Sequence, residues 1–343
     1  MILIFCTSHL YIPVTLSIIQ HEKGLYAIYT DRESIYKFLG KMYPKYEVFL
    51  LERDKPKNCF HVILTYARNL KKSMRRFFDS KQIDKLYFFH EGFCQEANWL
   101  IIHLHKTQNT ECFYIPVERT FNPDVKWEER HSLKLWFMKI RILVNWKYWC
   151  HFYVYMNYLY PVMDQSFYRC IQSKELPYDV KTIDILLEID KRLLGKDRYP
   201  KDCVVWLENT LRLFEVKWSE KSYKRFLNQL IEIFPIERFF FKGHPDLETK
   251  YGIENQMKEI PAFIPGNLLL KRFSVYVGVV SDLLFEAANV GTPTISTLYL
   301  IEMDDDDREM LVNYLRKRND KIMFPKSIQE LKKCLCVNKT EEV

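Results

Sequence analysis

Three short segments of the sequence end an apolar run with side chains that can bind anions or transfer protons. In residues 239–245, three phenylalanines are followed by Lys242, Gly243, His244 and Pro245. A lysine cation suits a nucleotide phosphate, and a histidine can protonate a departing phosphate oxygen near neutral pH. The alternative is a strand-ending turn with an incidental histidine. We favour phosphate binding, because the charged residues directly follow a predicted strand.

The second segment, residues 277–293, is typical of a strand, a serine, a helix and a Gly-Thr-Pro turn. Ser281 begins the predicted helix, so its hydroxyl and the neighbouring amides, that of Asp282 among them, would face an anion with the helix dipole behind them. Glu286 follows about one and a half turns later, where its carboxylate could accept hydrogen bonds from ribose hydroxyls. Alternatively, Ser281 is only a cap and Glu286 is solvated. Together with His244, the segment favours phosphate binding.

The third segment, residues 86–92, again ends a predicted strand in ionisable residues and a glycine: His90, Glu91 and Gly92. An imidazole or carboxylate there could remove a proton from an acceptor hydroxyl. The alternative is a turn in which Gly92 supplies unusual backbone angles. The residues alone do not separate the two interpretations.

The elements that must position these segments alternate between strands and helices. Strands are predicted at residues 2–6, 25–30, 47–51, 86–89, 112–115, 203–207, 238–242, 275–279 and 294–297. Helices are predicted at residues 11–20, 58–78, 95–105, 180–194, 220–234, 247–251, 282–289, 309–317 and 327–334. Such alternation indicates mostly parallel sheets, whose ligands bind at the carboxyl ends of the strands. The expected fold class is α/β, with two Rossmann-like domains, residues 1–175 and 176–343, facing a central cleft.

Other residues after predicted strands are weaker candidates for lining this cleft. Thr7 and Ser8 follow the first strand, and Asn209 and Thr210 follow the strand at 203–207. Residues in these positions are more often plain loop residues.

Residues 126–160 are basic, rich in aromatic side chains and helical in period. We therefore expect a helical region here, within the first domain. It could pack in the core, lie on a membrane surface or stack nucleic-acid bases. Core packing is favoured, and membrane contact is the main alternative, because Trp136, Trp146 and Trp149 lie among lysines and arginines as in headgroup regions.

Composition excludes several classes of protein. Hydrophobic residues form 48% of the 343 residues, which excludes a disordered chain. The net charge of +7 is too modest and dispersed to indicate nucleic-acid binding. Nine cysteines without a CxxC pair suit a reducing cytoplasm and no zinc site. We expect no bound metal, because the acidic run at 304–307 is better explained as a solvated helix start.

In this order, the motifs resemble those of the bacterial GT-B-fold sialyltransferases, namely the lipooligosaccharide sialyltransferases and capsular polysialyltransferases. The resemblance covers the layout of residues 1 to about 297. It implies that His244 binds and protonates the CMP phosphate and that Ser281 is a phosphate ligand. The family's general base lies in a D/E-D/E-G motif, which here is His90-Glu91-Gly92, so either His90 or Glu91 serves; we lean slightly to Glu91.

The sequence departs from the family elsewhere too. The usual serine pair is Val280-Ser281, and the family's Pro-x-Glu segment is Pro265-Gly266-Asn267. Asn267, beside Gly266, therefore stands where a carboxylate would recognise the base or ribose. These departures bear on the donor's identity more than on glycosyl transfer.

The resemblance implies an inverting, metal-independent glycosyltransferase without a cofactor. The preferred donor is CMP-sialic acid, and the preferred acceptor is a bacterial surface glycan, lipooligosaccharide or capsule. The alternatives are another donor (CMP-Kdo, a UDP-sugar or a CDP-polyol) or a non-catalytic protein that binds membranes or nucleic acid. The expected location is the cytoplasm, with peripheral contact at the inner membrane and no nucleic-acid partner.

Overall fold

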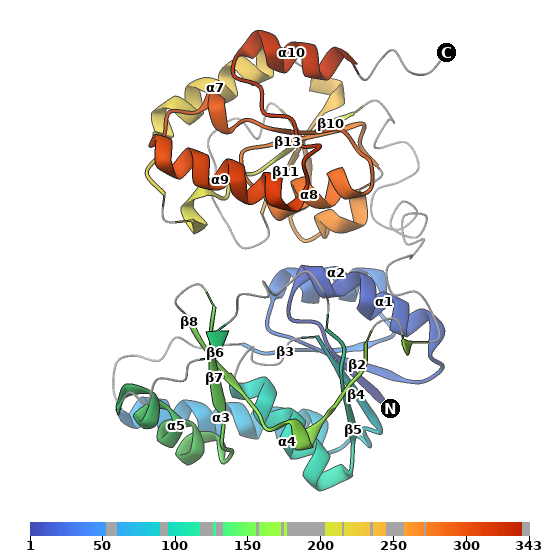
Figure 1. Cartoon of the computed structure of the whole chain (residues 1–343). Helices are drawn as coiled ribbons and strands as arrows, with labels where there is room; N and C mark the ends of the chain where they lie inside the picture. The colour runs from blue at the N-terminus through green and yellow to red at the C-terminus, as the bar shows by residue number, and fades with distance from the viewer. Residues whose placement is uncertain are drawn as a thin grey trace. The chain divides into compact units, whose positions relative to one another are not determined.

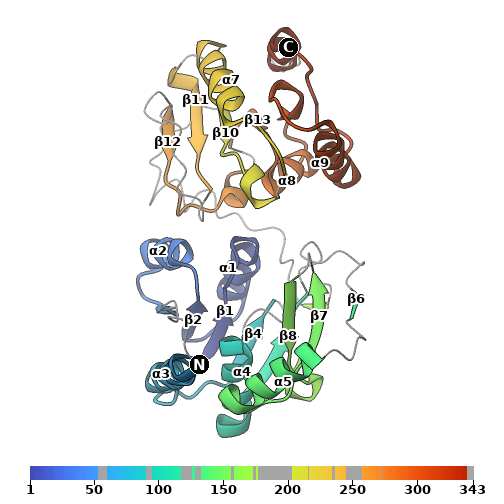
Figure 2. The ribbon, with the colours of Figure 1, turned by 90° about the vertical axis from the view of Figure 1, so that its left-hand side faces the viewer.

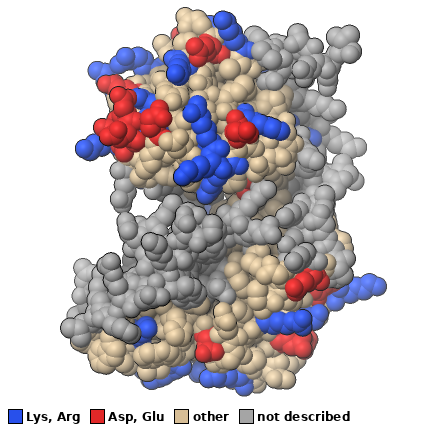
Figure 3. All heavy atoms as spheres, viewed as in Figure 1, with Lys and Arg blue, Asp and Glu red and all other residues tan. Residues whose placement is uncertain are grey.

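The computed structural model describes residues 1–52, 60–89, 95–116, 126–127, 133–155, 158–172, 175–176, 203–214, 216–233, 236–244, 257–270 and 272–337. The chain divides into two compact units, Met1–Ile183 and Asp184–Val343 (Figure 1). Figure 3 shows both basic and acidic side chains among the described residues of each unit. This mixture fits a chain whose 51 basic and 44 acidic residues leave a net charge of +7.

Unit 1 is built on a six-stranded sheet in the order β3-β2-β1-β4-β5-β9, in which every pairing is parallel. In chain order this is 3-2-1-4-5-6, the Rossmann arrangement. The strands are β1 (Ile2–Phe5), β2 (Tyr26–Thr30), β3 (Glu47–Leu50), β4 (Lys85–Phe88), β5 (Glu111–Tyr114) and β9 (Arg169–Cys170).

Helices cover both faces of this sheet, which explains why its central strands are apolar on both sides. Both views place α1 and α2 on one face and α3 and α4 on the other (Figures 1 and 2). Leu3 and Phe5, two residues apart on β1, belong to the same core cluster as Phe78 and Leu100. The helices are α1 (Ile12–His21), α2 (Glu33–Met42), α3 (Phe60–Phe78), α4 (Gln95–Gln108) and α5 (Leu133–Trp146), with single turns η1 (His9–Tyr11) and η2 (Gln165–Phe167).

Two elements of unit 1 differ from the sequence-based expectation. Helix α2 was not predicted, although its four buried side chains recur at helical spacing: Ile35, Phe38, Leu39 and Met42. The expectation of one helical region over residues 126–160 is wrong. Helix α5 is followed by Lys147 in the left-handed region, with a φ of 62°, and then by two strands of an antiparallel sheet whose first strand precedes the helix. Its strands are β6 (Lys126–Trp127), β7 (His151–Tyr155) and β8 (Tyr158–Val162), the last two rich in aromatic residues, which favour strands.

Unit 2 is built on a five-stranded sheet in the order β12-β11-β10-β13-β14, again with every pairing parallel. The strands are β10 (Val204–Leu207), β11 (Phe239–Lys242), β12 (Lys258–Ile260), β13 (Val275–Gly278) and β14 (Thr294–Ser296). The helices are α7 (Glu220–Ile233), α8 (Asp282–Asn289), α9 (Asp305–Arg318) and α10 (Ile328–Val337), with turns η5 (Leu211–Leu213), η6 (Ile236–Arg238), η8 (Gly266–Leu269) and η9 (Leu298–Leu300).

These two sheets confirm the predicted α/β class with Rossmann-like units. Strand β12 was not predicted, and the helices predicted at 180–194 and 247–251 lie outside the described residues. Within the described part of the chain, no helix has the length and apolar character needed to cross a membrane.

Candidate functional site

The topology of unit 2 creates a switch point at the carboxyl end of β10. This strand lies between β11 and β13, so the chain leaves it towards one side first and returns to the other side later. Loops that diverge in this way open a crevice at the sheet edge, where ligands of doubly wound folds bind. The register pairs Leu207 with Lys242, so the residues that follow β10 and β11 begin at the same level.

Glu208 fixes the backbone of the loop that carries His244. It is buried, it follows β10 directly, and its N–H donates to the carbonyl of Lys242 at 3.0 Å. Its carboxylate Oε2 accepts the N–H of His244 at 2.5 Å. His244 itself is half-exposed at the carboxyl end of β11, where the sequence predicted it. Pro245 lies outside the described residues.

Lys242 lies beneath this loop. Its Nζ donates to the carbonyl oxygens of Gly243 at 2.7 Å and Ala262 at 3.2 Å. Burial lowers its pKa from 10.5 to about 8, although the carboxylates of Glu208 and Glu259 act in the opposite direction. The predicted phosphate ligand therefore supports the loop from inside, with its ammonium held by two backbone carbonyls.

Asn209 and Thr210 connect the loop after β10 to the loop after β13. The Thr210 hydroxyl donates to the carbonyl of Val280 at 2.5 Å. The Asn209 side chain is 1% exposed, and its Oδ1 accepts the N–H of Leu211 at 2.8 Å. Its Nδ2 donor has no partner among the described residues. An unpaired amide donor is therefore buried at this edge of the sheet, where most buried polar groups would have a partner.

The start of α8 follows β13, the strand on the other side of β10. Ser281 is its N-cap, with the Leu283 N–H 3.3 Å from the hydroxyl oxygen, and is half-exposed. Turn η8 packs against this point, since a Cβ added to Gly266 would lie 2.5 Å from Leu283 Cδ2. Asn267 follows in the same turn and is half-buried. The structure thus brings Gly266 and Asn267 to the helix start that Ser281 opens.

The two acidic residues predicted on α8 lie in different surroundings. Asp282 is exposed, and its Oδ1 accepts from the Tyr314 hydroxyl at 2.7 Å and pairs with Arg318 at 2.9 Å, both on α9. Glu286 is buried within α8. The outer carboxylate therefore links α8 to α9, and a direct contact of either residue with a nucleotide stays a prediction.

In unit 1, the loop after β1 holds Thr7 and Ser8. Thr7 is buried, and the Ser8 hydroxyl caps η1 by accepting the Leu10 N–H at 3.4 Å. Tyr11 packs against Phe89, with ring centroids 5.3 Å apart, so this loop lies beside the end of β4. His90, Glu91 and Gly92 come next along the chain and lie outside the described residues.

A pocket of about 570 Å³ lies elsewhere in unit 1, towards the amino-terminal ends of its strands. Lys85 and Arg169, which line it, are the first residues of β4 and β9. Glu22 in its wall pairs with Lys85 at 3.3 Å and also accepts from the Tyr87 hydroxyl. This pocket is therefore distinct from the edge where the chain places the predicted site residues.

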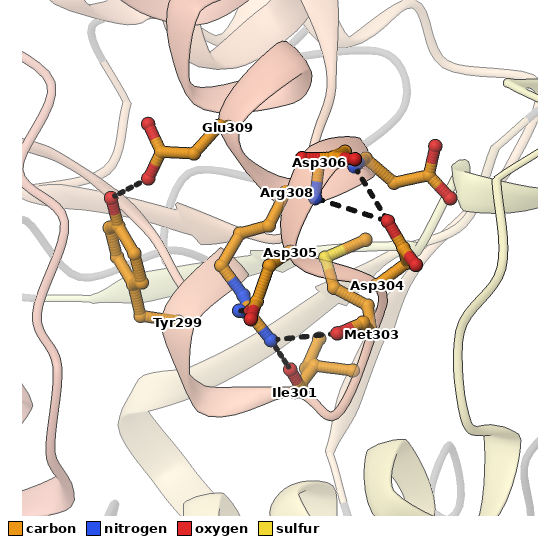
Figure 4. A network of polar contacts seen from close by, with 9 residues as sticks. Tyr299, Ile301, Met303, Asp304, Asp305, Asp306, Arg308 and Glu309 are labelled. Carbon is orange, nitrogen blue, oxygen red and sulfur yellow. Dashed lines mark hydrogen bonds and ion pairs between the residues drawn. The ribbon is translucent and has the colours of Figure 1, made fainter.

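The acidic run at 304–307 starts a helix, as the sequence predicted. The Asp304 carboxylate accepts the N–H groups of Asp306 and Asp307, and Arg308 reaches back to the carbonyl of Met303 at 3.0 Å (Figure 4). In the described part of the chain, no group of three His, Cys, Asp or Glu side chains could hold a metal ion.

Glu208 is the residue that the sequence analysis missed at this edge. The signal was present, because an acidic residue directly follows the predicted strand at 203–207. The rule that singled out His244, an ionisable residue at the end of an apolar strand, applies to Glu208 equally.

No protein-family model matches the chain, and no curated protein matches it in sequence. Similar solved structures include the UDP-GlcNAc 2-epimerase from Methanocaldococcus jannaschii, 9% identical with a TM-score of 0.48 over 99% of this chain and 93% of that one. The E. coli heptosyltransferase WaaC, solved with ADP-2-deoxy-2-fluoro heptose, is 11% identical with a TM-score of 0.43 over 100% and 99%. The glycosyltransferase VinC, in complex with dTDP, is 10% identical with a TM-score of 0.42 over 99% and 94%. At these identities, the activities in those names are statements about those proteins alone.

Proposed function

We propose that the chain is a GT-B-type glycosyltransferase that binds a nucleotide-sugar donor at the carboxyl edge of the unit 2 sheet. The observation that carries this proposal is the meeting of the loops after β10, β11 and β13 at one switch point. The start of α8 and the Asn209 amide donor lie at that edge. Residues 1–175 would then be the acceptor-side domain and residues 176–343 the donor domain.

Each donor-side residue has a role that its surroundings support. Ser281 and the start of α8 bind the phosphate, which the helix dipole also attracts. His244, on a backbone fixed by Glu208, hydrogen-bonds or protonates the departing phosphate. Lys242 adds positive charge beneath the same loop. Asn267 and Glu286 are the proposed partners of the base and ribose.

The remaining features of the reaction come from the sequence resemblance. Glu91 or His90 deprotonates a glycan hydroxyl, which attacks the anomeric carbon from the face opposite the nucleotide, without a metal. CMP-sialic acid is the preferred donor, with CMP-Kdo, a UDP-sugar or a CDP-polyol as alternatives. The acceptor is a bacterial surface glycan on a lipid carrier, which would place the enzyme in the cytoplasm at the inner membrane.

A thermal-shift titration with CMP, CDP, UDP, GDP and AMP tests the site. A nucleotide at 100 times its dissociation constant adds about 2.7 kcal/mol to the free energy of unfolding, which should raise Tm by several degrees. Stabilisation by CMP alone supports a CMP-sugar donor. Stabilisation by UDP alone or CDP alone indicates a UDP-sugar or a CDP-polyol donor instead. If no nucleotide stabilises the chain, the proposed site is wrong.

The variant Asn209→Asp sharpens this test. It keeps an oxygen that can accept from the Leu211 N–H and replaces the unpartnered N–H donor with a negatively charged oxygen. We expect it to bind the nucleotide at least about tenfold more weakly, because the N–H donor is lost and the new carboxylate repels a phosphate. Asn228→Asp, on the exposed side of α7, is the matched control. Wild-type binding by Asn209→Asp would contradict the assignment.

A further inference from the structure

Helix α5 presents an apolar face to solvent. Its opposite side packs against α3 and α4 through the buried residues Leu135, Ile142 and Trp146. The exposed fractions of Trp136 and Phe137 are 54% and 61%, and Leu143 and Val144 are exposed seven residues further on. Because these spacings return to the same side after two turns, the four side chains form one stripe. Large exposed apolar patches on soluble proteins usually mark an interaction surface.

The two most exposed side chains of this stripe are aromatic. The rings of Trp136 and Phe137 contact each other edge to face, with centroids 5.3 Å apart. Trp149, just after the helix, is 46% exposed, and the Lys139 ammonium lies 5.7 Å from its ring centroid. Tryptophan beside a lysine suits the boundary between hydrocarbon and headgroups, because the ring is apolar and the cation remains hydrated.

The charge of the segment has a single sign. Residues 133–149 contain Lys134, Lys139, Arg141 and Lys147 and no aspartate or glutamate. Arg141 and Lys147 are exposed. This charge complements an anionic surface. A second copy of the chain is a poor occupant, because it would bring two basic surfaces together. A single-stranded nucleic acid usually lies in a groove, whereas a helix face is convex.

We propose that the α5 face docks on an anionic lipid bilayer. We define the α5 face as Trp136, Phe137, Leu143, Val144 and Trp149 together with Lys139, Arg141 and Lys147. The helix lies in the plane of the interface, with the aromatic rings among the headgroups and the cations beside lipid phosphates. This inference is independent of the proposed glycosyl transfer, since it concerns a different surface.

Vesicle co-sedimentation of the full chain tests the proposal. We expect binding to vesicles of phosphatidylglycerol and phosphatidylcholine, weaker binding to phosphatidylcholine alone, and loss of binding as salt screens the charges. Removing one cation should weaken binding about fivefold, the equivalent of about 1 kcal/mol, and Arg141→Gln with Lys147→Gln should weaken it about 25-fold. Lys221→Gln with Lys332→Gln, both exposed, removes the same charge elsewhere in the chain and should have little effect.

A second pair of variants tests the apolar stripe. Trp136→Ser with Phe137→Ser should weaken vesicle binding at least tenfold, because two interfacial aromatic rings are lost. Leu25→Ser with Met310→Ser, which are 74% and 50% exposed, is the control. Brominated lipids should quench wild-type tryptophan fluorescence more than that of Trp136→Phe, which keeps the apolar ring and removes one emitter.

Three results would overturn the proposal. The first is failure of the wild type to bind anionic vesicles at low salt. The second is equal binding by the α5-face variants and their controls. The third is a dimer, or a complex with an oligonucleotide, that Trp136→Ser with Phe137→Ser abolishes while no vesicle is bound. Nucleotide stabilisation, measured on the same variants, should be unchanged and separates this test from that of the proposed function.

Discussion

The protonation of one buried residue, Lys242, affects the stability of the whole chain. Its pKa is about 8 in the folded chain, against an ordinary value of 10.5. Below pH 8 the folded state carries the full cost of the buried charge. Between these two values the unfolded chain binds more protons, so the contribution of Lys242 to the free energy of unfolding rises with pH, by up to about 3 kcal/mol.

Denaturant unfolding across this pH range measures the effect. Burial raises the pKa of the Cys6, Cys112 and Cys150 thiols to about 12, which lowers stability at alkaline pH. The informative quantity is therefore the free energy of unfolding of the wild type minus that of Lys242→Met. This difference should rise with pH from pH 8 upwards. Lys221→Met, exposed on α7, should show no such difference from wild type. A pH-independent difference for Lys242→Met would contradict the prediction.

At the scale of elements, β10 and β13 approach closely at Gly278. A Cβ added there would lie 3.1 Å from Leu207 Cβ and 3.6 Å from the Leu207 carbonyl oxygen. Leu207 Cβ is not the end of a flexible side chain, so Gly278→Ala requires the backbone of β10 or β13 to shift by a few tenths of an ångström beside the switch point. We expect a loss of about 1–3 kcal/mol in the free energy of unfolding, the usual cost of overpacking.

Gly40→Ala is the matched control for this change. Gly40 lies inside α2, and nothing is within 4 Å of an added Cβ. Alanine there should stabilise the chain by up to about 1 kcal/mol, because it is a better helix former than glycine. Denaturant unfolding of both variants measures the contrast, and two changes of the same sign would contradict it.

At the scale of the whole molecule, the proposed donor site involves one unit of the two. Hydrogen exchange of the full chain with and without a bound nucleotide should therefore show protection confined to unit 2. It should be strongest in residues 203–214, 236–244 and 257–289, which hold the loops at the switch point and the start of α8. Backbone N–H groups that bind a phosphate exchange more slowly, and ligand binding suppresses local opening. Protection centred on unit 1 instead would contradict the donor-domain assignment.

The sequence by itself determined the α/β class and most of the strands, because buried parallel strands are short apolar runs that end in turns. It also placed His244 and Ser281 at the ends of β11 and β13, since these positions depend only on where each run stops. The prediction of one helical region was wrong for the aromatic residues after α5. A basic, aromatic segment suits a helix or a strand equally well until its partners are known. The left-handed Lys147 and the pairing of β7 with β8 decide that segment.

Only the tertiary structure decided which candidates meet. The parallel order β11-β10-β13 brings Glu208 to the His244 backbone and Thr210 to Val280, across 36 and 70 residues of sequence. The sequence pattern predicted nucleotide contacts for Lys242, which ends a strand, and for Asp282, which starts a helix. In the structure Lys242 instead donates to backbone carbonyls and Asp282 pairs with α9. The local sequence pattern predicts which helix or strand a residue belongs to and whether it lies at the end of that element. Hydrogen bonds and burial between distant segments decide what its side chain faces.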